Sequence, residues 1–174
     1  MKRQNLRAMA ETGIMCALSY LLNLITVYKM PQGGTVSAGA MVPIIVISAR
    51  RGWKWGVAAG AVSGLLQFML GDKYSFHPLS ILLDYILAYA VVGLADLFAK
   101  GDKRKMSYGI VIVVFARLVF HVLSGAVVFY EFAGGQNPWL YSIGYNASYM
   151  LPELAVTLVL SWLLLSSKQI FVKK

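Results

Sequence analysis

Four ionisable residues lie inside otherwise apolar stretches of this chain: Asp84, Arg117, His121 and Glu153. Ionisable side chains are costly in an apolar surrounding, so they usually face the protein interior and mark a functional site. Arg117 and His121 are four residues apart, which places them on one face of a helix. Arg117 and Glu153 lie about equally far from the ends of their stretches, and we expect them to form a buried structural ion pair.

Asp84 and His121 favour a different chemistry, the binding of a flat, nitrogen-rich cation. Each lies about two to three helical turns from the end of its stretch, so the two side chains reach a similar depth. A carboxylate supplies the countercharge and aromatic rings attract a cation, while an amide and phenols orient a ligand through hydrogen bonds. The residues expected to form this half-buried pocket are Asp84, Tyr85, His121, Phe129, Tyr141, Tyr145 and Asn146.

Three short segments rich in glycine and aromatic residues adjoin these positions, at residues 28–37, 71–78 and 131–139. Glycine and proline favour tight turns, and aromatic rings offer flat faces to a ligand. We expect the pocket to lie beneath these three loops. Aromatic residues also form belts at membrane interfaces, and we assign that role to Trp53, Trp55 and Trp162.

The elements that carry these residues are apolar enough to lie in a bilayer. Of the 174 residues, 59% are hydrophobic and only 13% are charged, with a mean hydropathy of +0.67. A small soluble fold has too little interior to bury this much apolar surface. We predict an all-α integral membrane protein, a single domain over residues 1–174 with six transmembrane helices. The expected spans are Leu6–Val27, Val36–Ala49, Trp53–Leu70, Pro78–Ala99, Ser107–Tyr130 and Trp139–Ser166.

The second span is short, so we expect it to be tilted, packed inside the bundle or partly in the interface. Orientation follows from the basic residues, because basic loops stay in the cytoplasm. Thirteen of the sixteen lie at the two ends and in alternate loops, so we predict that both termini are cytoplasmic. These thirteen are Lys2, Arg3, Arg7, Arg50, Arg51, Lys54, Lys100, Lys103, Arg104, Lys105, Lys168, Lys173 and Lys174.

Several other classes of function are not favoured. The chain has one cysteine, Cys16, so it has no intrachain disulfide, and we see no metal-ligand spacing, nucleophile motif or phosphate-binding glycine loop. The net charge of +9 resides at helix ends and not on a soluble basic face, which argues against nucleic acid. Ala38-Gly39-Ala40 lies too far beyond the first apolar run to be a signal-peptide cleavage site.

Six blocks of the sequence, taken in order and spacing, form a recognisable pattern. These are Met30–Gly34, Val42–Ile44, Arg51–Gly52, Leu82–Tyr85, Phe120–Ala126 and Trp139–Ala147. In this pattern the chain resembles, over nearly its whole length, the thiamine-specific substrate-binding component (S-component) of energy-coupling factor (ECF) transporters.

This resemblance implies six helices and a thiamine site near the outer surface, closed by the first loop, which contains Gln32, Gly33 and Gly34. Carried over residue by residue, the thiamine contacts fall on Asp84, Tyr85, Tyr74, His121, Tyr141 and Asn146. The chain departs from some members at four positions, because it has Asp84 and Ala38 in place of glutamate and Phe129 and Gly34 in place of tryptophan. Trp139 is a candidate substitute ring.

The resemblance also implies partners. S-components use a stripe of small residues on the first helix to dock on a transmembrane coupling subunit, which works with two ATPase subunits. Gly13 and Ala17, four residues apart, match this stripe, and such spacing lets helices approach closely in lipid.

We therefore predict a membrane-embedded thiamine-binding subunit and not an enzyme, with no cofactor. One alternative is an S-component for another vitamin or a precursor such as hydroxymethylpyrimidine. Two others are an intramembrane enzyme that uses Asp84 and His121, and a membrane scaffold without a ligand.

Overall fold

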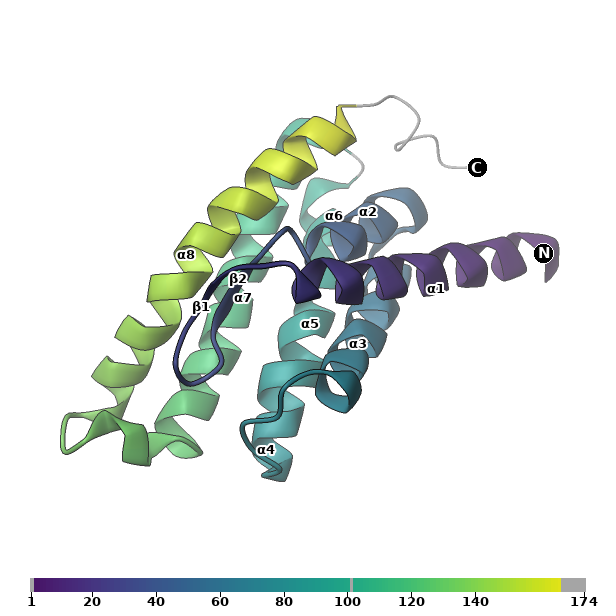
Figure 1. Ribbon diagram of the computed structural model, residues 1–174. Helices are drawn as coiled ribbons and strands as arrows, with labels where there is room; N and C mark the ends of the chain where they lie inside the picture. The colour runs from purple at the N-terminus through teal and green to yellow at the C-terminus, as the bar shows by residue number, and fades with distance from the viewer. Residues whose placement is uncertain (1, 101, 167–174) are drawn as a thin grey trace.

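The computed structural model describes residues 2–100 and 102–166, which form a helical bundle with one small hairpin (Figure 1). The first half contains α1 (Lys2–Leu24), β1 (Thr26–Lys29), β2 (Thr35–Ser37), α2 (Val42–Arg51) and α3 (Trp53–Leu70). The fourth helical segment is continuous but irregular: α4 (Pro78–Ser80), the π-helix η1 (Ile81–Leu87), α5 (Ala88–Ala90), the 3-10 helix η2 (Val91–Leu94) and α6 (Ala95–Ala99). The chain continues with α7 (Lys103–Val127), the 3-10 turn η3 (Tyr130–Ala133) and α8 (Pro138–Leu165).

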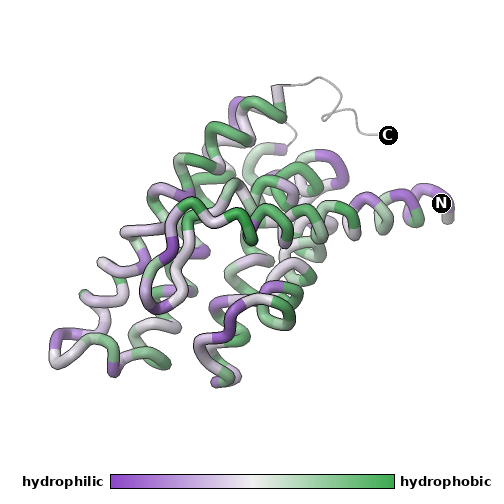
Figure 2. Tube along the Cα trace, in the orientation of Figure 1, coloured by the Kyte–Doolittle hydropathy of each residue, from purple (hydrophilic) through white to green (hydrophobic). Residues whose placement is uncertain are grey.

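The predicted helical membrane fold is confirmed, with six helical segments. Three of them are long and apolar enough to cross a membrane: Pro78–Ala99, Arg104–Val127 and Pro138–Leu165. Figure 2 shows the apolar character along most of the helical trace and polar character at the start of α1 and in the hairpin.

The prediction for the second span is corrected at its start. We expected a helix from Val36, but Thr35–Ser37 pairs antiparallel with Thr26–Lys29, and α2 begins only at Val42. With ten residues, α2 is about 15 Å long, roughly half the hydrocarbon thickness. Residues 42–49 are all buried, so α2 is packed inside the bundle, one of the three arrangements expected for it.

A stripe of glycines on α3 sets the position of the fourth segment. Gly56, Gly60 and Gly64 are four residues apart, and the backbone of the fourth segment lies directly against them. A Cβ atom at Gly60 would collide with the backbone carbonyl of Tyr89, and one at Gly64 with that of Tyr85. Small residues at this spacing allow two helices to approach at backbone distance. This contact holds η1, which carries Asp84, against the rest of the bundle.

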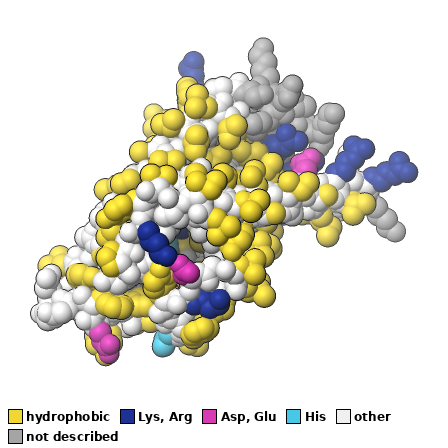
Figure 3. Space-filling model, in the orientation of Figure 1, with side chains coloured by type: hydrophobic (Ala, Val, Ile, Leu, Met, Phe, Trp, Pro, Cys, Tyr) yellow, Lys and Arg dark blue, Asp and Glu magenta, His cyan; other side chains and the backbone are white. Residues whose placement is uncertain are grey.

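The two ends of the bundle differ in charge. In Figure 1, α4 and the η3 connection lie at the lower end, which we call the cavity end. The Lys and Arg side chains gather mostly toward the upper and right-hand part of Figure 3, where α8 ends and α1 begins. Lys168, Lys173 and Lys174 lie outside the described residues. The charge asymmetry fits the predicted topology, and the cytoplasmic location of the termini stays a prediction.

We predict that Gly60→Ala destabilises the bundle, because the new methyl group meets the Tyr89 carbonyl. Overpacking of this kind costs roughly 1–3 kcal/mol, and each kcal/mol lowers the Tm of a chain of this size by about 2–4 °C. Thermal unfolding of the detergent-solubilised protein measures the change. Gly144→Ala is the control, because Gly144 lies in α8 with open space around its Cα. Equal Tm values for the two variants would contradict the close helix contact.

Candidate functional site

A cavity of about 430 Å³ lies between the β1–β2 hairpin, α3, η1, α7 and α8. Its volume suits a small organic ligand. The cavity brings together eleven of the twelve binding residues predicted from the sequence. These are Gln32, Gly33, Gly34, Tyr74, Asp84, Tyr85, His121, Phe129, Tyr141, Tyr145 and Asn146.

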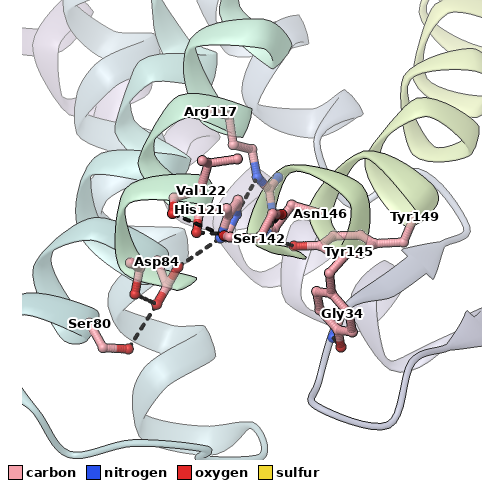
Figure 4. A network of polar contacts seen from close by, with 11 residues as sticks. Gly34, Ser80, Asp84, Arg117, His121, Val122, Ser142, Tyr145, Asn146 and Tyr149 are labelled. Atoms are coloured by element: carbon pink, nitrogen blue, oxygen red, sulfur yellow. Dashed lines mark hydrogen bonds and ion pairs between the residues drawn. The ribbon is translucent and has the colours of Figure 1, made fainter. Parts of the chain in front are cut away.

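The Asp84 carboxylate lines the cavity and contacts three polar side chains (Figure 4). Ser80, one helical turn earlier, donates to Oδ2 at 2.8 Å, and the Ser124 hydroxyl from α7 donates to the same oxygen. The other carboxylate oxygen, Oδ1, lies 2.8 Å from Nδ1 of His121. Asp84 and His121, which were expected to reach one pocket, are therefore in direct contact. A π-helix such as η1 is rare and is often found at functional sites, and here it carries the acidic residue.

Tyrosine rings from α8 form one wall of the cavity. Tyr141 and Tyr145 are nearly parallel at 6.1 Å between ring centroids, and Tyr149 meets Tyr145 edge to face at 6.0 Å. Asn146 lies on the adjacent strip of α8, where its Nδ2 donates to the Ser142 carbonyl at 2.9 Å and its Oδ1 accepts from the Tyr149 hydroxyl at 2.7 Å. Tyr141, Tyr145 and Tyr149 are four residues apart, so their rings lie along one face of α8.

The tip of the hairpin rests on these rings. The Tyr145 hydroxyl accepts hydrogen bonds from the backbone N–H groups of Gln32 (3.1 Å) and Gly34 (3.4 Å). A Cβ atom at Gly33 would collide with the Tyr74 ring, and one at Gly34 with the Tyr149 ring. Gly33 also has φ +98°, a conformation that favours glycine. The two glycines therefore let the hairpin seat closely against the aromatic lining.

An ion pair joins the hairpin to the connection between α3 and α4. Lys29 Nζ, at the end of β1, lies 2.6 Å from Oδ2 of Asp72, and both residues line the cavity. The hydrogen bond from Lys29 holds the pKa of the Asp72 carboxyl below its usual value, and the same contact raises the pKa of Lys29.

Comparison with known proteins identifies the family. The model of the thiamine transporter protein family matches residues 9–173. The chain belongs to the thiamine transporter family. It is 38% identical over 169 residues to the thiamine transporter ThiT of Bacillus subtilis, with 88% of each chain covered. It is 32% identical over 194 residues to ThiT of Lacticaseibacillus paracasei, covering 99% of this chain and 94% of the relative.

A solved structure of ThiT from Listeria monocytogenes has the same fold, with a TM-score of 0.85 and 25% identity. The match covers 97% of this chain and 98% of that one. Membership of this family makes the chain a multi-pass membrane protein with a transport function, not an enzyme. The resemblance found in the sequence is confirmed.

Trp139 is the one predicted binding residue of this transporter that does not line the cavity. Its side chain is 48% exposed in the first turn of α8. Trp139 and Tyr141 are two residues apart, which is about 200° around a helix, so the turn that directs Tyr141 into the cavity directs Trp139 away from it. We therefore do not include Trp139 in the site.

The expected ion pair between Arg117 and Glu153 is wrong. Among the described residues, no salt bridge joins them. Glu153 accepts hydrogen bonds from the backbone N–H (2.6 Å) and hydroxyl (2.7 Å) of Ser37. Arg117 lies over the Tyr89 ring, 4.3 Å from its centroid, and its Nε donates to Nε2 of His121 at 3.3 Å. Glu153 thus braces the hairpin, and Arg117 belongs to the site.

Four further residues of the cavity, Ser80, Tyr89, Ser142 and Tyr149, were not predicted from the sequence. Helical spacing offered a signal for each of them, because each lies four residues from a predicted site residue: Asp84, Tyr85, Asn146 and Tyr145, respectively.

We predict that Asp72→Asn loosens the hairpin at neutral pH. Because the pKa of Asp72 is lowered in the folded protein, the ion pair stabilises the closed hairpin above the unfolded value of about 4 and is lost as pH falls below it. Hydrogen exchange of residues 26–37 should therefore be slower in the wild type than in the variant at pH 5–8. The two should converge only well below pH 4, where Asp72 is protonated in the folded protein as well. Equal exchange at pH 7 would show that the ion pair does not hold the hairpin.

Proposed function

We propose that this chain captures thiamine in the cavity described above, for import into the cell. The observation that carries the proposal is the half-buried Asp84 carboxylate, held by Ser80, Ser124 and His121 at the wall of a tyrosine-lined cavity. Membership of the thiamine transporter family and the relatives named thiamine transporter support the choice of ligand.

The cavity matches the chemistry of thiamine, which carries an aminopyrimidine ring and a permanently cationic thiazolium ring. The carboxylate of Asp84 balances the cationic charge, and the aromatic rings of Tyr85 and Phe129 offer π-faces to it. Tyr74, Tyr141 and Tyr145 add rings that combine apolar faces with hydroxyl groups, so they stack on a flat ligand and orient it.

We predict that Asp84→Asn weakens thiamine binding by more than tenfold, about 1.4 kcal/mol, because the countercharge is removed while the shape is kept. Isothermal titration of the detergent-purified protein measures affinity and stoichiometry, and the wild type should bind at one saturable site per chain. Glu131→Gln is the control, because Glu131 is an exposed carboxylate in η3 that does not line the cavity. An unchanged affinity in Asp84→Asn would remove this role from the carboxylate.

A second candidate ligand is another vitamin or a thiamine precursor, because a carboxylate and an asparagine amide also suit the pyrimidine portion alone. Competition in the same titration separates the candidates. If thiamine binds far more tightly than hydroxymethylpyrimidine or riboflavin, our proposal is supported. If hydroxymethylpyrimidine competes as well as thiamine or better, the precursor is the ligand of this site.

We further propose that the chain is the S-component of an ECF transporter and docks on a coupling subunit through α1. Ala8, Thr12, Cys16 and Ser19 form the buried side of this helix. Gly13 and Ala17 lie on its exposed side, where a Cβ atom at Gly13 would have nothing within 4 Å. This small-residue face allows a partner helix to approach closely. The coupling subunit and two ATPase subunits then drive release of thiamine into the cell.

We predict that the double substitution Gly13→Leu and Ala17→Leu abolishes thiamine uptake by cells but leaves thiamine binding by the purified chain within about twofold. The added side chains block the partner helix, and neither Gly13 nor Ala17 lines the cavity. Gly144→Leu on α8 is the control, since it places a leucine in open space on another helix and should keep uptake. Normal uptake by the double variant would exclude this face as the docking surface.

A further inference from the structure

The cavity contains a second charged side chain, Arg117, beside the Asp84 carboxylate. Arg117 lies on α7 one turn before His121, and both residues line the cavity. Its guanidinium covers the ring of Tyr89 at 4.3 Å, and Nε points at Nε2 of His121 (3.3 Å; Figure 4). Three charged or titratable groups therefore follow one another in a row: Arg117, His121 and Asp84.

The directions of the hydrogen bonds in this row show which ring nitrogen of His121 carries the proton. A guanidinium has only donors and stays protonated in proteins, so Nε2 of His121 must be the acceptor of the Arg117 bond. An imidazole that accepts at Nε2 is neutral and carries its proton on Nδ1. This proton faces Oδ1 of Asp84 at 2.8 Å, where the carboxylate accepts it.

Asp84 alone would favour the protonated, positively charged form of His121. A carboxylate next to a histidine stabilises the imidazolium, which would form an internal ion pair with Asp84. Such a pair would cancel the charge that an incoming cation needs. Arg117 opposes this state in two ways, because its own positive charge repels an imidazolium and because its Nε–H occupies the lone pair that would take the second proton.

We infer that Arg117 is a positioning residue that keeps His121 neutral, so that the charge of Asp84 stays available to a cationic ligand. The inference rests on the proposed function. It assigns Arg117 a part in cation selectivity and not in direct contact with the ligand.

The other groups that face this row do not supply the same effect. Tyr149 of α8 presents its ring edge to the imidazole, with 6.4 Å between ring centroids. Asn146 of α8 donates to the backbone carbonyl of His121 and not to the ring. Tyr89 of α5 supports the guanidinium, and Glu153 of α8 is engaged by Ser37. Asp84 from η1 and Arg117 are thus the two charges that decide the state of His121.

The test is the pH dependence of thiamine affinity between pH 5.5 and 8. The wild type should change by less than about twofold. Arg117→Met keeps a long side chain over Tyr89 but removes the charge and the donor that oppose protonation of His121, so the neighbouring Asp84 favours the imidazolium as the pH falls. Its affinity should fall about tenfold between pH 7.5 and 5.5, because thiamine must then displace a proton.

Two further variants separate this role from a general structural one. Arg117→Met combined with His121→Gln should again show a flat pH profile, because the titrating group is gone, whereas Arg117→Lys should keep the flat profile of the wild type. A flat profile for Arg117→Met, or a sloping one for the double variant, would overturn the inference.

The protonation state of His121 can also be measured directly, even if Arg117→Met fails to bind thiamine. The chain has two histidines, so 15N-labelled histidine gives two imidazole signals in NMR spectra, and His77→Gln assigns them. At pH 6, His121 should be a neutral Nδ1–H tautomer in the wild type and an imidazolium in Arg117→Met. An imidazolium in the wild type would refute the inference. Because this readout needs no ligand, it stays informative if thiamine is not the substrate.

Discussion

The partial burial of one carboxylate, Asp84, constrains the arrangement of the cavity. An acid in an apolar bundle is stable only when donors surround it, because it has left the water that would otherwise solvate it. Here the donors come from two segments: Ser80 from its own helix, and Ser124 and His121 from α7. These contacts form only when η1 and α7 have the right rotation about their axes and the right depth relative to each other. The same contacts leave the carboxylate facing a cavity lined by aromatic rings.

Close contact between helix backbones, with no side chains in between, holds the Asp84 segment in position. The glycines of α3 bring its backbone against the fourth segment, where larger side chains would hold the helices apart. In a membrane there is little hydrophobic force between helices, so close packing and interhelical hydrogen bonds carry much of their association. The irregular helix that bears Asp84 is therefore fixed from one side by α3 and from the other by α7.

Much of this architecture could be predicted from the sequence, because lipid makes hydrophobic length a direct measure of a span. The bounds expected for the third and fourth spans, Trp53–Leu70 and Pro78–Ala99, agree with the structure. Most of the cavity residues could also be predicted, because residues four apart in a helix, such as Tyr141 and Tyr145, share one helical face. Depth along a helix, however, says nothing about rotation around its axis. The sequence therefore did not indicate that Trp139 lies outside the cavity lining or that Arg117 contacts His121 and not Glu153. The hairpin was missed because Thr26–Lys29 continues the apolar run of the first helix with no glycine or proline before it.

The short helix α2 has a consequence for the interior of the membrane. A helix of half the usual length leaves room in the hydrocarbon layer that other parts of the chain must occupy, and the non-helical hairpin precedes α2 in the chain. Peptide groups at that depth cannot be left to lipid, so irregular backbone is tolerated there only inside a protein wall. Glu153 and Tyr145 meet this requirement by accepting hydrogen bonds from the hairpin backbone, at Ser37 and at its tip. At these positions the protein itself takes the place of water around the hairpin backbone.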